Sequence, residues 1–165
     1  VGVYKNGYYG DSAYTFAVGK VTPEVRHLME VTLAALQAGA ERAIAGNRLG
    51  DIGHAVQSEV DPHGYGIVRE MVGHGIGKNL HEPPEIPNYG RRGNGMKLKE
   101  GMVVCIEPMI NLGSSGIYVD SDGWTIHARD NQASAHYERM VAIHKDHAEI
   151  LTSYDFIDDV ISVNG

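Results

Sequence analysis

The feature of this 165-residue chain that most constrains its fold is a change in hydrophobic period along the sequence. Apolar side chains recur at helical spacing from residue 22 to 46 and again from 49 to 60. Thr22-Pro23 predicts the start of the first helix, with Thr22 as its N-cap, and Gly46 predicts its end. The second helix should stop at Asp61-Pro62, because proline cannot continue a helix.

Strand-like segments lie on both sides of these helices. Residues 1–10 predict a hairpin that turns at Asn6-Gly7, a preferred pair for tight turns. We expect further strands at 14–18, 67–72, 102–110, 117–119, 123–127 and 135–144, and a Gly-, His- and Pro-rich loop at 73–95. This order predicts an α+β domain in which helices cover one face of an antiparallel-rich sheet.

Composition and charge exclude several classes of protein. The net charge is −7 and there is no long basic run, which disfavours binding to duplex nucleic acid. No apolar run reaches the roughly 18 to 20 residues of a membrane span, and no signal peptide is visible. The single cysteine, Cys105, sits in an apolar strand, which favours inert core packing in a reducing compartment over a reactive thiol.

Four residues, far apart in the sequence, combine a carboxylate or imidazole with strand-and-loop surroundings: Asp11, His74, Glu107 and Glu138. One nitrogen and three carboxylates suit a dinuclear metal site, because carboxylates bridge divalent ions and offset their charge. Glu107 is the strongest candidate, since it interrupts an apolar strand where an unpaired charge is costly. Taken alone, Asp11 is more typical of a turn or cap residue, and Glu138 is more typical of a solvent-facing strand residue.

Two histidines lie near the glycines at 73, 75 and 77. Glycine there would allow close backbone approach to a ligand around His74. A phosphate-binding loop is excluded because the glycine spacing fits no such motif. His81 could face the same cleft and donate to a substrate carbonyl, or lie in a surface loop. The other histidines are interpreted as structural or solvated: His27, His54, His63, His127, His136, His144 and His147.

Several separate motifs together resemble the type I methionine aminopeptidases. They are Gly73-His74-Gly75-Ile76-Gly77 through His81-Glu82-Pro83, Ile106-Glu107-Pro108-Met109, Asp122-Gly123-Trp124-Thr125 and Ser134-Ala135-His136-Tyr137-Glu138. Their order and gaps also match, and the resemblance covers essentially the whole chain. It implies the pita-bread fold, an α+β domain with a dinuclear metal site in the middle of a curved sheet.

The resemblance also implies a role for each site residue. Asp11 and Glu138 would bridge two divalent ions (Mn, Fe, Co or Zn), and His74 with Glu107 would bind one of them. Glu107 would be the general base, and His81 would steady the scissile carbonyl. Trp124 and Leu80 would contact the methionine side chain of the substrate, although the family usually has Phe at the position of Leu80.

One departure concerns the start of the chain. The family uses a further Asp eleven residues before the bridging one, a position that would precede Val1, and a second catalytic His further upstream. We therefore expect residues 1–165 to be a catalytic domain without its N-terminal segment, holding one ion tightly at best and having little activity. The resemblance further implies Met-peptide substrates, a cytoplasmic monomer and the option of ribosome association.

Two alternatives remain at this point. A proline-directed peptidase of the same fold shares the His-Gly and Glu-Pro motifs, but usually has Gly where this chain has Met109. A metal-free module that reuses the fold to bind a protein partner would be expected to lose ligands, and this chain keeps every ligand it could keep.

Overall fold

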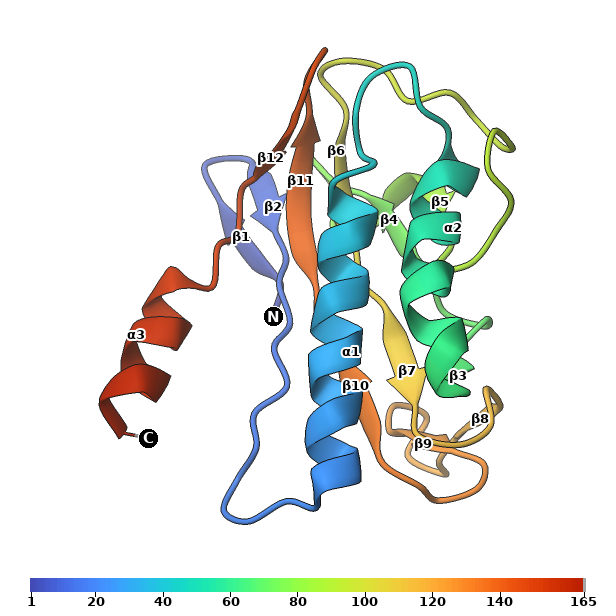
Figure 1. Cartoon of the computed structure of the whole chain (residues 1–165). Coiled ribbons are helices and arrows are strands. Elements are labelled where there is room, and N and C mark those ends of the chain that lie inside the picture. Colours follow the sequence, from blue (N-terminus) through green and yellow to red (C-terminus); the bar gives the residue numbers. More distant parts are fainter. Residues whose placement is uncertain (165) are drawn as a thin grey trace.

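The computed structural model describes residues 1–164, in which two long helices cover one side of a set of antiparallel strands (Figure 1). The helices are α1 (Pro23–Ala40) and α2 (Leu49–Val60), followed by the 3-10 turn η1 (Asp61–His63). Helix α3 (Asp155–Asn164) stands apart at the end of the chain. The expected α+β arrangement with helices on one face is confirmed.

The strands form four antiparallel sheets among the described residues. The largest has the order β12 (Ala148–Ile150), β11 (Arg139–Ile143), β6 (Val103–Ile106), β4 (Gly73–Gly75) and β5 (Glu82–Ile86). A three-stranded sheet has the order β10 (Ser134–His136), β7 (Met109–Asn111) and β3 (Gly66–Ile67). Two hairpins complete the set: β1 (Val3–Lys5) with β2 (Tyr8–Gly10), and β8 (Ile117–Val119) with β9 (Ile126–Ala128).

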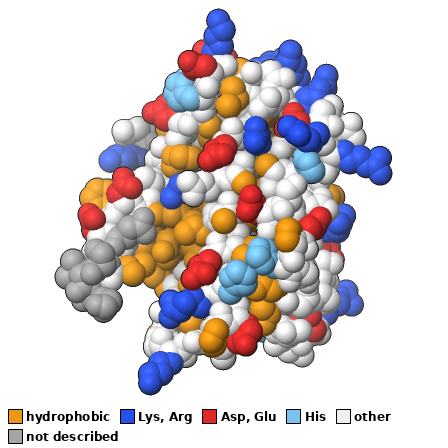
Figure 2. Space-filling view, viewed as in Figure 1, with side chains coloured by type: hydrophobic (Ala, Val, Ile, Leu, Met, Phe, Trp, Pro, Cys, Tyr) orange, Lys and Arg blue, Asp and Glu red, His pale blue; other side chains and the backbone are white. Residues whose placement is uncertain are grey.

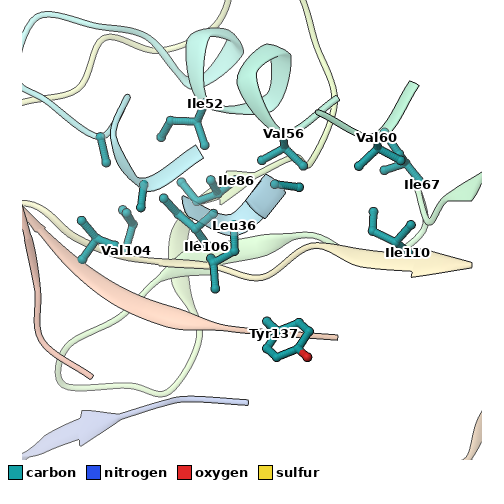
Figure 3. Packing of buried hydrophobic residues seen from close by; sticks show 14 of the residues in the cluster. Leu36, Ile52, Val56, Val60, Ile67, Ile86, Val104, Ile106, Ile110 and Tyr137 are labelled. Carbon is teal, nitrogen blue, oxygen red and sulfur yellow. The ribbon is translucent and has the colours of Figure 1, made fainter. Parts of the chain in front are cut away.

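The core lies between the two helices and the sheets (Figure 3). Leu36 of α1 and Val56 of α2 meet Ile106 of β6 there, and all three side chains are fully buried. Thr22 caps α1 as predicted, because its hydroxyl accepts a hydrogen bond from the Val25 amide at 3.4 Å. Burying one such aliphatic side chain stabilises a fold by about 1.5–3 kcal/mol, so this layer holds the sheet in place.

Several expected boundaries were wrong, and tertiary hydrogen bonds explain most of the differences. Helix α1 ends at Ala40 rather than near Gly46, because the Ala45 and Gly46 amides donate to His144 and Leu98 carbonyls instead. Residues 14–18 form no strand; only Ala13 makes an isolated bridge, to Glu138. The strand expected at 67–72 is reduced to β3, and the sequence analysis did not predict β12 or α3.

The segment 73–95 is not only a loop, since it contains β4 and β5. Gly73 is required there by strand packing rather than by a ligand. A Cβ on Gly73 would lie 2.2 Å from the Cys105 carbonyl oxygen of β6, which no side chain could tolerate. Glycine therefore lets β4 fit between its two neighbours.

The two long strands expected at 102–110 and 135–144 are each broken in the middle. β6 and β7 are separated by Glu107-Pro108, and β10 and β11 by Tyr137-Glu138. Arg139 pairs with Ile106 on one side of the breaks, and His136 pairs with Met109 on the other. Both carboxylates thus lie at the junction where the five-stranded sheet gives way to the three-stranded one.

The helix-covered face carries charges of both signs (Figure 2). Lys and Arg are interspersed with Asp and Glu, and hydrophobic side chains gather over the extended segment that follows β2. Phe16 and Val18 of that segment are largely exposed. None of the helices in the described part of the chain is long and apolar enough to cross a membrane.

Candidate metal centre

Strand alternation brings three of the predicted ligands to one face of the sheet. Side chains alternate between faces, and Ile106 and Val104 point into the helix-covered core. Cys105 therefore points to the opposite face, where it packs with Met140. His74 pairs directly with Cys105, so it shares that face, as does Glu107 two residues further along. Glu138, two residues before Met140, approaches from the break that precedes β11.

The distances confirm that these three side chains converge. The His74 Nε2 atom lies 3.4 Å from Oε1 of Glu107 and 3.9 Å from Oε1 of Glu138. The other ring nitrogen, Nδ1, is 2.9 Å from the Gly75 carbonyl oxygen. A backbone carbonyl at Nδ1 fixes the proton there and leaves the Nε2 lone pair directed at the two carboxylates.

Asp11 is buried on the same side but stands slightly apart. It follows β2, and its backbone amide lies 3.1 Å from the Met140 sulfur. Two groups of residues have donor atoms that all lie within 4.8 Å of one another in the described chain: His74 with Cys105 and Glu138, and Glu107 with His136 and Glu138. Asp11 belongs to neither group, although its charge acts on Glu138.

The backbone that carries Asp11 and Glu138 is held by a buried tyrosine. The Tyr154 hydroxyl lies 2.8 Å from the Ala13 carbonyl oxygen and 2.7 Å from that of Glu138. The same hydroxyl accepts a hydrogen bond from the Glu138 amide at 3.0 Å. Sequence reasoning missed Tyr154, because nothing local connects residue 154 with residues 13 and 138.

The electrostatics of the centre are those of a cation site. Burial first, and then the nearby negative charges of Glu107 and Asp11, together raise the pKa of Glu138 to about 7. Its Oε1 atom is buried and has no hydrogen-bond partner. Burial also raises the pKa of the Cys105 thiol far above its usual range, which fits an inert core cysteine. A buried carboxylate oxygen that lacks a partner is stabilised by a proton or a cation.

The three predicted substrate residues have different surroundings. The ring of His81 stands edge-on to that of His74 with centroids 4.4 Å apart, so His81 lies beside the centre. Leu80 packs on the small cluster of Ile76, Cys105 and Met140. Trp124 lies between β8 and β9 with 86% of its surface exposed.

An apolar cavity of about 250 Å³ lies beside the centre. Its walls come from residues on β7, β9 and β10 and from the segment after β3, including Met71, Met109, Ile126 and His136. Met109 and His136 are neighbours of the carboxylates at 107 and 138 in the sequence. The side chain of a molecule bound at the centre could therefore enter this cavity and contact its apolar walls.

His136, which the sequence analysis interpreted as structural or solvated, lies beside the candidate ligands in the structure. Its Nε2 atom lies 3.4 Å from Oε2 of Glu107, on the side of that carboxylate away from His74. The available indication was its position two residues before Glu138 in an alternating strand, which puts both side chains on one face.

Comparison with known proteins identifies the class that this fold and centre define. Residues 1–145 match the model of metallopeptidase family M24, and the chain belongs to that family. It is similar to the methionine aminopeptidase of Clostridium acetobutylicum, with 50% identity over 92% of this chain and 60% of the relative. Methionine aminopeptidase 1 of Bacillus subtilis is 44% identical, again over 92% of this chain and over 61% of the relative.

Comparison with solved structures also finds methionine aminopeptidases and a prolidase among the similar proteins. The methionine aminopeptidase of Rickettsia prowazekii superimposes with a TM-score of 0.90 and 43% identity, over 92% of this chain and 62% of that one. The prolidase of Pyrococcus furiosus superimposes with a TM-score of 0.72 and 28% identity, over 92% of this chain and 39% of that one. The expected pita-bread fold is confirmed, and the chain spans about 60% of the length of the curated relatives it matches.

Proposed function

We propose that the protein removes the N-terminal methionine of peptides and nascent proteins in a metal-dependent hydrolysis. The observation that carries the proposal is the buried Oε1 atom of Glu138, which has no hydrogen-bond partner. It lies 3.9 Å from the His74 Nε2 atom, and Oε1 of Glu107 lies 3.4 Å from the same nitrogen. The similarity to proteins named methionine aminopeptidase supports the choice of substrate.

The donor set fits divalent metal. His74, Glu107 and Glu138 would hold the ion, with Asp11 completing the set from the end of β2. Mixed nitrogen and oxygen ligands suit Mn, Fe, Co or Zn, and we propose two ions in the active protein. When bound, such ions polarise the scissile carbonyl and make water acidic enough to attack at neutral pH.

The residues of the chain carry out the remaining steps. Glu107 takes the proton of the attacking water and later delivers it to the leaving amine. His81, beside His74, donates a hydrogen bond to the scissile carbonyl oxygen as negative charge develops there. We propose that Leu80 and Trp124 contribute to the surface that accepts the methionine side chain.

Release of amino acids from model peptides tests this proposal on the protein at its natural length. With metal supplied, we expect methionine release from Met-Ala-Ser and no cleavage of Ala-Pro or Met-Pro bonds. Glu107→Ala should lower methionine release at least about a hundredfold, because the general base contributes that much. Glu100→Ala, at an exposed acidic residue away from the centre, is the matched control.

Two results would contradict the proposal. Cleavage next to proline without methionine release would favour the proline-directed alternative, which the lower identity to the Pyrococcus furiosus prolidase disfavours. Absence of bound metal in the purified wild-type protein, after loading, would leave only a binding module that reuses the fold.

A further inference from the structure

We infer that His136 is a direct metal ligand, which gives the centre a second imidazole in addition to the donor set proposed above. The inference rests on the proposed metal-dependent function, and it adds a nitrogen donor where the resemblance supplies only one. Three observations support it: the direction of the Nε2 atom, the spacing of the donor atoms, and the rigidity of the backbone that carries the ring.

The first observation is that the ring points its Nε2 atom inward. The side chain of His136 is 39% exposed, but the Nε2 atom itself is buried and has no hydrogen-bond partner. A buried nitrogen without a partner destabilises a fold, so this orientation requires a compensating contact. The nearest charged group is the Glu107 carboxylate, whose Oε2 atom is 3.4 Å away.

The second observation is the spacing of the donors. Two ligand atoms that each bond a metal at roughly 2.0–2.2 Å lie about 3–4 Å apart across a tetrahedral or octahedral ion. The distance of 3.4 Å between His136 Nε2 and Glu107 Oε2 falls in that range. Glu138 completes the group, because one donor atom from each of the three residues lies within 4.8 Å of the others.

The third observation is that the backbone of His136 is fixed before any ion binds. The His136 amide donates to the Thr15 hydroxyl at 2.9 Å, and that hydroxyl donates to the His136 carbonyl oxygen at 2.7 Å. Pairing with Met109 in β10 and β7 holds the other edge of the strand. A ligand on a rigid strand needs little ordering when the ion arrives, which favours binding.

The two imidazoles flank one carboxylate. His74 lies at Oε1 of Glu107 and His136 at Oε2. Glu107 can therefore share a metal with a nitrogen donor on either side, and Glu138 is in reach of both groups. A second imidazole should shift metal preference away from Mn, which favours oxygen donors, and toward Zn and Co.

Nitrogen NMR on the natural-length protein, labelled with ¹⁵N at histidine and loaded with ¹¹³Cd²⁺, tests the inference directly. A metal-bound Nε2 shows one-bond coupling to cadmium, and a nitrogen that only donates a hydrogen bond does not. We expect two coupled histidine signals in the wild type, of which His136→Gln removes one and His74→Gln the other. His127→Gln is the matched control, since His127 lines the same cavity but pairs with Asp120, and it should leave both.

A Zn²⁺ titration gives a second readout. His136→Gln should lower Zn²⁺ affinity about tenfold or more, and lower Mn²⁺ affinity less. A single coupled histidine in the wild type would overturn the inference, because His136 would then only donate to Glu107. That result leaves the proposed function intact, whereas a wild type that takes up no cadmium, zinc or manganese would refute both.

Discussion

Glu138 is the residue whose surroundings differ most from those of an ordinary surface carboxylate. It is 4% exposed, and the acidic side chains Glu107 and Asp11 lie near it. Its pKa of about 7 lies above the ordinary carboxyl value, so without metal the folded state holds a proton that the unfolded state loses. The free energy of unfolding therefore falls as pH rises from about 4.5 to about 7, and stays lowered above that.

The fall in the free energy of unfolding with rising pH predicts how Glu138→Gln behaves in the metal-free protein. Glutamine stays neutral, so at pH 8 the variant should unfold with a free energy higher than that of the wild type by about 1–3 kcal/mol. The difference should vanish at about pH 3, more than one unit below the ordinary carboxyl pKa, because the wild-type carboxyl is then protonated in both states. Urea unfolding in the presence of a chelator measures it at both pH values.

The exposed Glu100 provides the control for this comparison. Glu100→Gln should show no such pH-dependent difference from the wild type. If wild type and Glu138→Gln were equally stable across this pH range, the ionised carboxylate of Glu138 would not destabilise the folded state.

At the scale of elements, helix α2 positions Glu107, the proposed general base, through one loop. Gly53 of α2 is buried against the loop that follows β5, where a Cβ would lie 2.3 Å from the Tyr89 carbonyl oxygen. The same loop carries Asn88, whose side-chain amide donates to the Glu107 carbonyl oxygen at 3.1 Å. A movement of helix α2 against this loop would therefore also move the backbone of Glu107.

We therefore expect Gly53→Ala to act at two places. The clash is with backbone, which cannot rotate away, so the variant should lose about 2–3 kcal/mol of stability. Movement of the loop should also weaken Zn²⁺ binding by displacing Glu107. Ser58→Ala, at an exposed position of the same helix, should change neither. Thermal unfolding measures the first effect and a Zn²⁺ titration the second. Unchanged stability of Gly53→Ala would contradict the prediction, because the loop would then move aside without destabilising the fold.

The elements also show where reasoning from sequence succeeds. Helices α1 and α2 and the Asn6-Gly7 hairpin were predictable because periodicity, caps and turn residues are local. Strands β4 and β5 were missed because Gly-His-Gly and Glu-Pro-Pro-Glu have little β propensity, and pairing with β6 holds them. Glu107 was predictable as a carboxylate inside an apolar strand. For His136 the sequence offered only its position two residues before Glu138, because its contact with Glu107 depends on how β7 and β10 continue past the breaks.

At the scale of the whole molecule, the candidate centre joins segments that are distant in the sequence. Asp11 follows β2, His74 lies in β4, and the two glutamates lie at the breaks of the sheets. Tyr154 connects the first and last of these segments through the Ala13 and Glu138 carbonyls. Because the unfolded chain cannot bring these donors together, an ion that binds the folded state should stabilise all of these segments at once.

This coupling predicts how far metal shifts the unfolding temperature. A free ion at 100 times its dissociation constant adds about 2.7 kcal/mol, which corresponds to roughly 5–10 °C for a domain of this size. We expect that rise on adding Zn²⁺ and its loss on adding a chelator, measured by calorimetry. His74→Gln should abolish most of the rise, whereas His54→Gln, at a half-buried position of α2, should keep it. An equal rise in both variants would mean that the ion stabilises the fold from a different site, since His74 stands between both carboxylates.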